Sequence, residues 1–230
     1  MKITMKRFCL ILFALLSAQA LMTQVNVKIG YNTGFVNGKV NNEILTEFNE
    51  LKKGELSDSL SIPFKGLSFV HGLNLGLRLK FSENSAFEVN WQNLSRSREA
   101  VGEINDVSLF KQELFYSFNQ LYMAYQSDFN GYGMGVGLGY NKVKIKDRIA
   151  GSDFKETVIN DSQLFARINL ALYFESSSSV SFSIQPYYQF SLADINLNPL
   201  KTELGLPSNE SVSDPFNMFG VSLVFYNGRQ

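Results

Sequence analysis

Residues 132–140 read YGMGVGLGY, with a large apolar or aromatic side chain at every even position and glycine between them. Successive side chains of a β-strand point to opposite faces of the sheet, so this period of two gives one apolar face and one bare face. The run is not a dinucleotide-binding loop, because Leu138 stands where G-x-G-x-x-G requires its third glycine. It predicts a β-strand whose glycines leave room for large side chains.

The same alternation recurs along the rest of the chain, and no run of 18 apolar residues follows position 20. Eight alternating segments span residues 25–35, 69–81, 87–92, 121–125, 132–140, 163–174, 180–192 and 219–225. Short turns are expected near 82–86, 126–131 and 175–179, and long loops near 37–67, 95–113, 147–161 and 193–215. This rhythm predicts an all-β fold, an eight-stranded antiparallel up-and-down transmembrane β-barrel with both chain ends on the periplasmic side.

The placement of charges indicates that the apolar faces point outward to lipid. Only 18% of the residues are charged, against roughly 25% in ordinary globular domains. No charge falls on an apolar face, and the opposite faces are mostly Gly, Ser, Asn and Gln. A soluble barrel would carry its Lys and Glu outside, whereas a lipid-facing charge costs about 2–4 kcal/mol at the midplane. The charges in mid-strand are Lys28, Arg78, Lys80, Glu88 and Arg167.

Aromatic residues mark both ends of the apolar faces, as in the interfacial girdles of membrane barrels. One rim would hold Phe81, Phe87, Tyr125, Tyr132, Phe174 and Phe225, and the other Phe35, Phe69, Tyr140, Phe190 and Phe219. A soluble β-sandwich gives no reason for two such bands.

Residues 1–20 predict a cleaved secretory signal peptide. A basic start is followed by nine apolar residues, too few to span a membrane as a helix, and by a small-residue cleavage site. These features are Lys2, Lys6 and Arg7, then residues 8–16, then Ala18-Gln19-Ala20. The chain's only cysteine, Cys9, lies in this segment, so the mature protein would have no thiol. Residues 21–230 are expected to form a single outer-membrane barrel domain.

The predicted signal peptide, the eight segments and the alternation of short and long loops resemble the small outer-membrane β-barrels, such as the OmpA transmembrane domain and OmpX. The resemblance covers essentially the whole mature chain and is one of architecture, without a family-specific motif. It implies a location in the bacterial outer membrane.

A strand register follows if outward residues pair with outward ones. Placing Phe81 opposite Phe87 brings Lys80 opposite Glu88, with Arg78 as a diagonal neighbour. Phe174 opposite Val180 brings Arg167 opposite Tyr187, and Tyr125 opposite Tyr132 sets Tyr122 and Phe118 across from Gly135 and Gly139. The predicted lumen therefore holds a polar core of Arg78, Lys80, Glu88 and Arg167. Inward rings at Phe118, Tyr122, Phe165, Tyr173 and Tyr187 would plug it.

Two features at the predicted extracellular end, one in the first long loop and one at the end of the fifth strand, suggest surface roles. Asn42 can cap a helix that runs to about Lys53 and ends at Gly54, with an apolar stripe of Ile44, Leu45, Phe48 and Leu51. We expect this helix to fold over the barrel mouth, and a docking surface for a partner is the alternative. A basic ladder of Lys142, Lys144, Lys146 and Arg148 lies at the predicted outer rim. Contact of this ladder with the phosphates of lipopolysaccharide is one hypothesis, and a solvated loop base is the alternative.

The composition argues against several classes of function. Twenty-one basic and 21 acidic residues give no net charge, so nucleic-acid binding is not supported. His71 is the only histidine, which leaves little material for a metal site or a Ser-His-Asp triad, and we expect no cofactor. The sequence predicts a non-enzymatic structural, assembly or surface-interaction component, with membrane lipid and a protein at the extracellular loops as partners. The alternatives are a narrow solute channel and a lipid-modifying enzyme.

Overall fold

The computed structural model describes residues 24–55, 60–104, 108–149, 152–175, 180–207 and 211–228. Within these ranges eight long antiparallel strands close into one barrel, in the order β1-β10-β7-β6-β5-β4-β3-β2. The strands are β1 (Gln24–Asn37), β2 (Phe69–Ser82), β3 (Ser85–Ile104), β4 (Ser108–Phe129), β5 (Tyr132–Ile149), β6 (Glu156–Glu175), β7 (Val180–Ser191) and β10 (Asn217–Asn227). The predicted fold class is confirmed. The predicted signal peptide, residues 1–20, lies outside the described residues.

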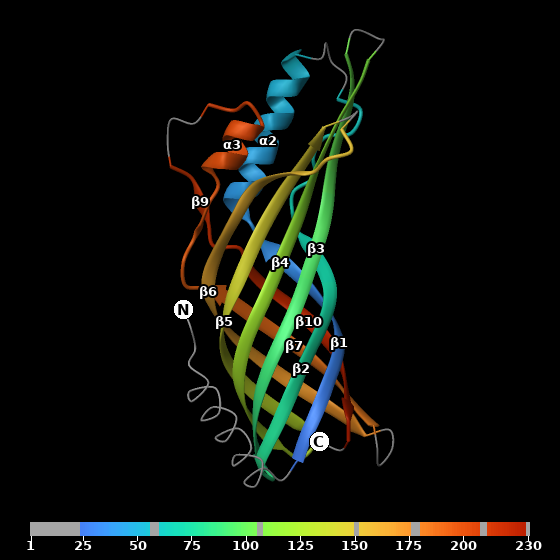
Figure 1. Ribbon diagram of the computed structural model, residues 1–230, viewed down its shortest axis with the longest axis vertical. Coiled ribbons are helices and arrows are strands. Elements are labelled where there is room, and N and C mark those ends of the chain that lie inside the picture. Colours follow the sequence, from blue (N-terminus) through green and yellow to red (C-terminus); the bar gives the residue numbers. More distant parts are fainter. Residues whose placement is uncertain are drawn as a thin grey trace, which may run out of the picture.

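The two ends of the described chain lie at the same end of the barrel, opposite the helices (Figure 1). Tight turns at residues 83–84 and 130–131 also close this end. Gly131 has φ +79, a left-handed conformation that glycine adopts at little cost. The third predicted short turn falls on residues 176–179, which are outside the described ranges. This end corresponds to the periplasmic end of an outer-membrane barrel.

The outer face of every barrel strand carries exposed apolar side chains. Met134, Val136 and Leu138 on β5 are 58–65% exposed, while the residues between them are glycines. At one rim Phe35 stacks on Phe219, and at the other Phe174 stacks on Phe182, each with ring centroids 4.9 Å apart. No helix in the described residues is long and apolar enough to cross a membrane. The exposed apolar side chains and the aromatic rims form the lipid-facing band of a barrel that crosses the membrane with its strands.

Four strands are longer than predicted, and residues assigned to long loops continue them. Most of the predicted loops 95–113 and 147–161 belong to β3, β4, β5 and β6, which rise above the rest of the barrel (Figure 1). The reason is an inversion of the pattern above the membrane. There the outward residues become polar and the inward ones apolar, as at the buried Leu94, Phe118, Val143 and Ile145. The pattern of outward apolar residues used for the prediction stops at the membrane boundary, although the strands continue beyond it.

A helical cap fills the top of this extension. Helix α2 (Lys39–Glu55) buries Ile44, Leu45 and Phe48 against the inward apolar residues of the long strands. The predicted helix is confirmed, but it begins three residues earlier, Leu51 is exposed, and the Asn42 side chain accepts the Leu67 N–H at 2.7 Å. Helix α3 (Asn198–Glu203) and the short pair β8 (Ile195–Asn196) and β9 (Ser213–Asp214) complete the cap.

The predicted strand register is wrong at three hairpins. Arg78, not Lys80, lies opposite Glu88, and a bulge between Lys80 and Ser82 takes up the difference. Arg167 lies opposite Gln189, and Tyr122 lies opposite Gly139. Pairing outward with outward residues leaves any shift of an even number of residues open. The turns at residues 83–84 and 130–131 are also tighter than the five and six residues assumed for them.

Candidate functional site

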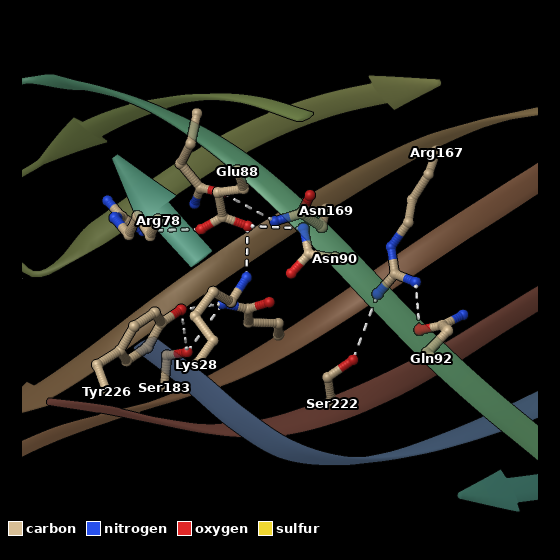
Figure 2. Close-up of polar contacts among 12 residues, drawn as sticks. Lys28, Arg78, Glu88, Asn90, Gln92, Arg167, Asn169, Ser183, Ser222 and Tyr226 are labelled. Atoms are coloured by element: carbon tan, nitrogen blue, oxygen red, sulfur yellow. Dashed lines mark hydrogen bonds and ion pairs between the residues drawn. The ribbon is translucent and has the colours of Figure 1, made fainter. Parts of the chain in front are cut away.

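The lower lumen holds a buried ion-pair network around Glu88 on β3. Lys28 Nζ donates to Glu88 Oε2, and Arg78 Nη1 donates to Glu88 Oε1 at 3.3 Å. The second guanidinium nitrogen of Arg78 binds Asp128, and Arg78 also donates to the Tyr173 hydroxyl. Figure 2 shows the Glu88 carboxylate between the two cations. Lys28, Arg78 and Glu88 are at most 3% exposed, so each charge depends on the others rather than on water.

Arg167 on β6 forms a second level of the lumen. Its Nη1 donates to Gln92 Oε1 at 3.1 Å and its Nη2 to Ser222 Oγ at 3.3 Å (Figure 2). The guanidinium carbon lies 3.7 Å from the ring centre of Tyr187 and 4.9 Å from that of Tyr122. No carboxylate in the described residues makes an ion pair with it within 4.0 Å. Two aromatic faces therefore stabilise this cation, as cation–π contacts do when desolvated.

Large rings pack directly above Arg167. Tyr122 and Phe165 meet edge to face with centroids 6.0 Å apart. A Cβ at Gly139 would lie 2.6 Å from the Phe165 ring and even closer to Tyr122, so this position requires glycine. Phe118 and Phe216 meet edge to face, with ring centroids 5.6 Å apart, and both belong to the apolar core under α2. The predicted inward rings Phe118, Tyr122, Phe165 and Tyr187 are buried, and Tyr173 is partly buried.

The lumen site predicted from sequence is only partly assembled. The structure brings Arg78 and Glu88 together and places Arg167 on the next level. Lys80 lies opposite Ala86 and is partly exposed, so the predicted Lys80–Glu88 pair is wrong. The partners that sequence reasoning did not assign are Lys28 and Asp128. The inward parity of Lys28 could have revealed it, whereas Asp128 fell within a predicted turn that is in fact strand.

A basic depression of about 1010 Å³ lies on the outer surface of β2–β5, directly above the apolar band. Five basic residues line it: Lys142, Lys144, Lys146, Arg96 and Lys155. Short polar residues lie beside the lysines on the neighbouring strands. Lys142 pairs with Asn119 on β4, which pairs with Asn93 on β3. Lys144 pairs with Ser117 on β4, which pairs with Ser95 on β3. The long lysines beside these short side chains create the hollow, whose lining contains no carboxylate.

Arg148, the fourth member of the predicted ladder, does not line this basic depression. Its Nε donates to Glu113 Oε2 at 2.8 Å, and Lys111 binds the other oxygen of Glu113 at 2.9 Å. The hydrogen bond from Lys111, assisted by Arg148, lowers the pKa of Glu113. Arg148 is therefore neutralised by a neighbour within the sheet.

A carboxyl cluster joins the cap to the long strands. Asp147 on β5 is buried, and its Oδ2 accepts a hydrogen bond from Gln112 Nε2 at 2.9 Å. Burial raises the pKa of Asp147, and the negative charge of Glu156 adds to this effect. Burial, with the charges of Asp147 and Glu156, likewise raises the pKa of Glu203 at the end of α3. Burial and mutual repulsion therefore favour the protonated forms of these carboxyl groups.

His71 lies on the outer surface at the upper rim of the band. Its Nδ1 is hydrogen-bonded to the Tyr31 hydroxyl at 2.5 Å, and its ring packs beside Phe69. Among the described residues no group of three or more His, Cys, Asp or Glu side chains is arranged to hold a metal ion. The histidine thus has a tyrosine partner in an aromatic girdle.

No protein-family model and no curated protein matches the chain. Among solved structures, it is similar to Ail of Yersinia pestis in complex with the heparin analogue sucrose octasulfate, with a TM-score of 0.47, 15% identity, and coverage of 88% of this chain and 96% of Ail. Neisserial surface protein A gives a TM-score of 0.44 and 6% identity over 89% and 97% of the two chains. The outer membrane protein OprG from Pseudomonas aeruginosa gives 0.41 and 11% over 90% and 96%.

The strand pairing and surface chemistry of this chain indicate an outer-membrane barrel without any argument from these low identities. A closed antiparallel barrel with an apolar exterior, aromatic rims and a polar lumen is the architecture of bacterial outer-membrane proteins. The predicted outer-membrane β-barrel architecture is confirmed.

Proposed function

We propose that the protein is a closed, non-enzymatic component of the outer-membrane surface, which acts through its extracellular end and does not conduct solutes. The observation that supports this proposal is the filling of the lumen at successive levels. Ion pairs occupy the lower level, Arg167 and tyrosines the middle, and apolar side chains with α2 the top. An eight-stranded barrel is just wide enough for side chains to fill its interior.

Opening such a lumen would carry a high energetic cost. A solute would have to displace the cations that bind Glu88, and breaking a buried pair costs about 3–5 kcal/mol. It would also have to displace α2, whose Phe48 is 1% exposed. The extracellular end, by contrast, presents the polar face of α2 and long hairpins that rise above the apolar band. This shape suits contacts at the cell surface, with lipid or with another protein.

The test is single-channel recording in planar bilayers with the folded, purified protein. We expect no steady conductance. Phe48→Ala, which weakens only the cap, should also stay silent because the ion network and the rings remain below it. Steady openings on the nanosiemens scale would overturn the proposal in favour of the narrow channel.

A further inference from the structure

We infer that the basic depression on β2–β5 binds the phosphorylated headgroup of a glycolipid in the outer leaflet. The inference goes beyond the proposed function, because it concerns the outer wall and holds whether or not the lumen conducts. It combines three observations: the height of the depression, its unpaired lysines and the hydrophobic surface directly beneath it.

The first observation is the height of the site. Along β5 the last apolar outward residue is Tyr140, and Lys142 follows it on the same face. The neighbouring strands change at the same level. Leu121 gives way to Asn119 on β4, and Trp91 to Asn93 on β3. The depression therefore begins where acyl chains end, at the level of lipid headgroups.

The second observation is the charge. Arg148 and Lys111 share Glu113, and Lys201 binds Glu47 in the cap. In the described part of the chain no carboxylate lies within 4.0 Å of the amino groups of Lys142, Lys144 and Lys146. Alternate residues of a strand are roughly 6.5–7 Å apart, so the three ammonium groups can surround one phosphate or contact two adjacent ones. Lysine is a common phosphate ligand.

The third observation distinguishes a lipid from a free anion. Lys155 packs on the Phe115 ring at 3.6 Å and closes the upper side of the hollow, whereas the lower side leads to the exposed Leu121. A ligand with a phosphate and acyl chains would contact the lysines and the apolar band together. Inorganic phosphate would contact the lysines alone and would still compete with water for them.

The experiment compares three probes on the full-length folded protein in detergent: diphosphoryl lipid A, the same lipid without its phosphates, and inorganic phosphate. Binding is measured by native mass spectrometry at several concentrations and two ionic strengths. The test variant is Lys142→Gln/Lys144→Gln/Lys146→Gln. The matched control, Lys39→Gln/Lys53→Gln/Lys65→Gln, removes the same charge from exposed positions on α2 and the segment after it. The heat-dependent gel shift verifies that each variant is folded.

For diphosphoryl lipid A we expect about 100-fold weaker binding to the test variant, because each lysine near an anionic surface contributes roughly fivefold. The control should change binding by less than about threefold, within the range of exposed charges. The lipid without phosphates and inorganic phosphate should both bind the unmodified protein weakly. Unchanged lipid A binding by the test variant, equal loss by the control, or equal binding of the dephosphorylated lipid would overturn the inference. Inorganic phosphate that binds as tightly as the lipid would assign the hollow to a free anion and would also overturn it.

Discussion

Replacing Glu88 by glutamine should destabilise the barrel more than any other conservative change in its lumen. The buried charges of the membrane-spanning lumen are the cations Lys28, Arg78 and Arg167 and the carboxylates Glu88 and Asp128. Glu88 binds two of the three cations. Glu88→Gln keeps the size of the side chain but leaves Lys28 with no carboxylate partner and Arg78 with Asp128 alone. Removal of one member of a buried pair costs about 3–5 kcal/mol, which sets the expected loss of unfolding free energy.

A second variant separates charge imbalance from packing. Lys28→Met with Glu88→Gln removes the unpaired cation and leaves the Arg78–Asp128 pair intact. We expect this double variant to recover at least half of the loss, because replacement of a whole buried pair is often close to neutral. Glu50→Gln, on an exposed pair of α2, is the control and should cost less than about 1 kcal/mol.

The assay is urea unfolding in lipid vesicles, followed by the fluorescence of Trp91, the only tryptophan in the chain. A loss below about 1 kcal/mol for Glu88→Gln would refute the reasoning, as its cost would then be that of an exposed pair. A double variant as unstable as the single one would also refute it.

Three further outcomes are expected. Gly139→Val should prevent folding, seen as loss of the heat-dependent gel shift, because its Cβ would overlap Tyr122 and Phe165; a normal shift would contradict the filled lumen. Phe48→Ala should cost about 3–5 kcal/mol and lower the hydrogen-exchange protection of α2 while the barrel strands stay protected. Burial raises the pKa of Asp147, so its stabilising effect is complete below the ordinary carboxyl pKa and is lost as pH rises through the raised value. Asp147→Asn should therefore raise the melting temperature at neutral pH and reduce its dependence on pH. An unchanged profile of melting temperature against pH would show that this carboxyl cluster does not cause the pH dependence of stability.

The membrane-spanning part of the fold could be predicted from sequence because lipid imposes a strict rule on one face of each strand. At Met134, Val136 and Leu138 the alternation is unambiguous, and the glycines between them identify the inward face. Above the membrane the rule reverses. Val143 and Ile145 point inward while Lys142 and Lys144 point outward, so the apolar residues of the same strand change from its outer to its inner face.

Strand register could not be predicted to the residue, and this affected the candidate site. Parity placed Arg78, Glu88 and Arg167 in the lumen, but the partner of Glu88 depends on a bulge near Lys80 that no local pattern indicates. Lys28 reaches Glu88 across β2, a contact between strands that are not sequence neighbours. On the outer surface, Arg96 from β3 and Lys155 from the segment before β6 line the depression with the lysines, whereas Arg148 pairs with Glu113 instead.

The orientation of the strands is tested most directly by depth-dependent quenching of Trp91. This residue lies on the outer face of β3, is 37% exposed, and its Nε1 donates to Asn119 at the upper edge of the apolar band. In vesicles, bromine atoms placed on the acyl chains near the headgroups should quench its fluorescence strongly, while aqueous iodide should have little effect. Strong quenching by iodide with none by the brominated lipids would show that this face points to water, and the membrane-spanning barrel with its filled lumen would be wrong.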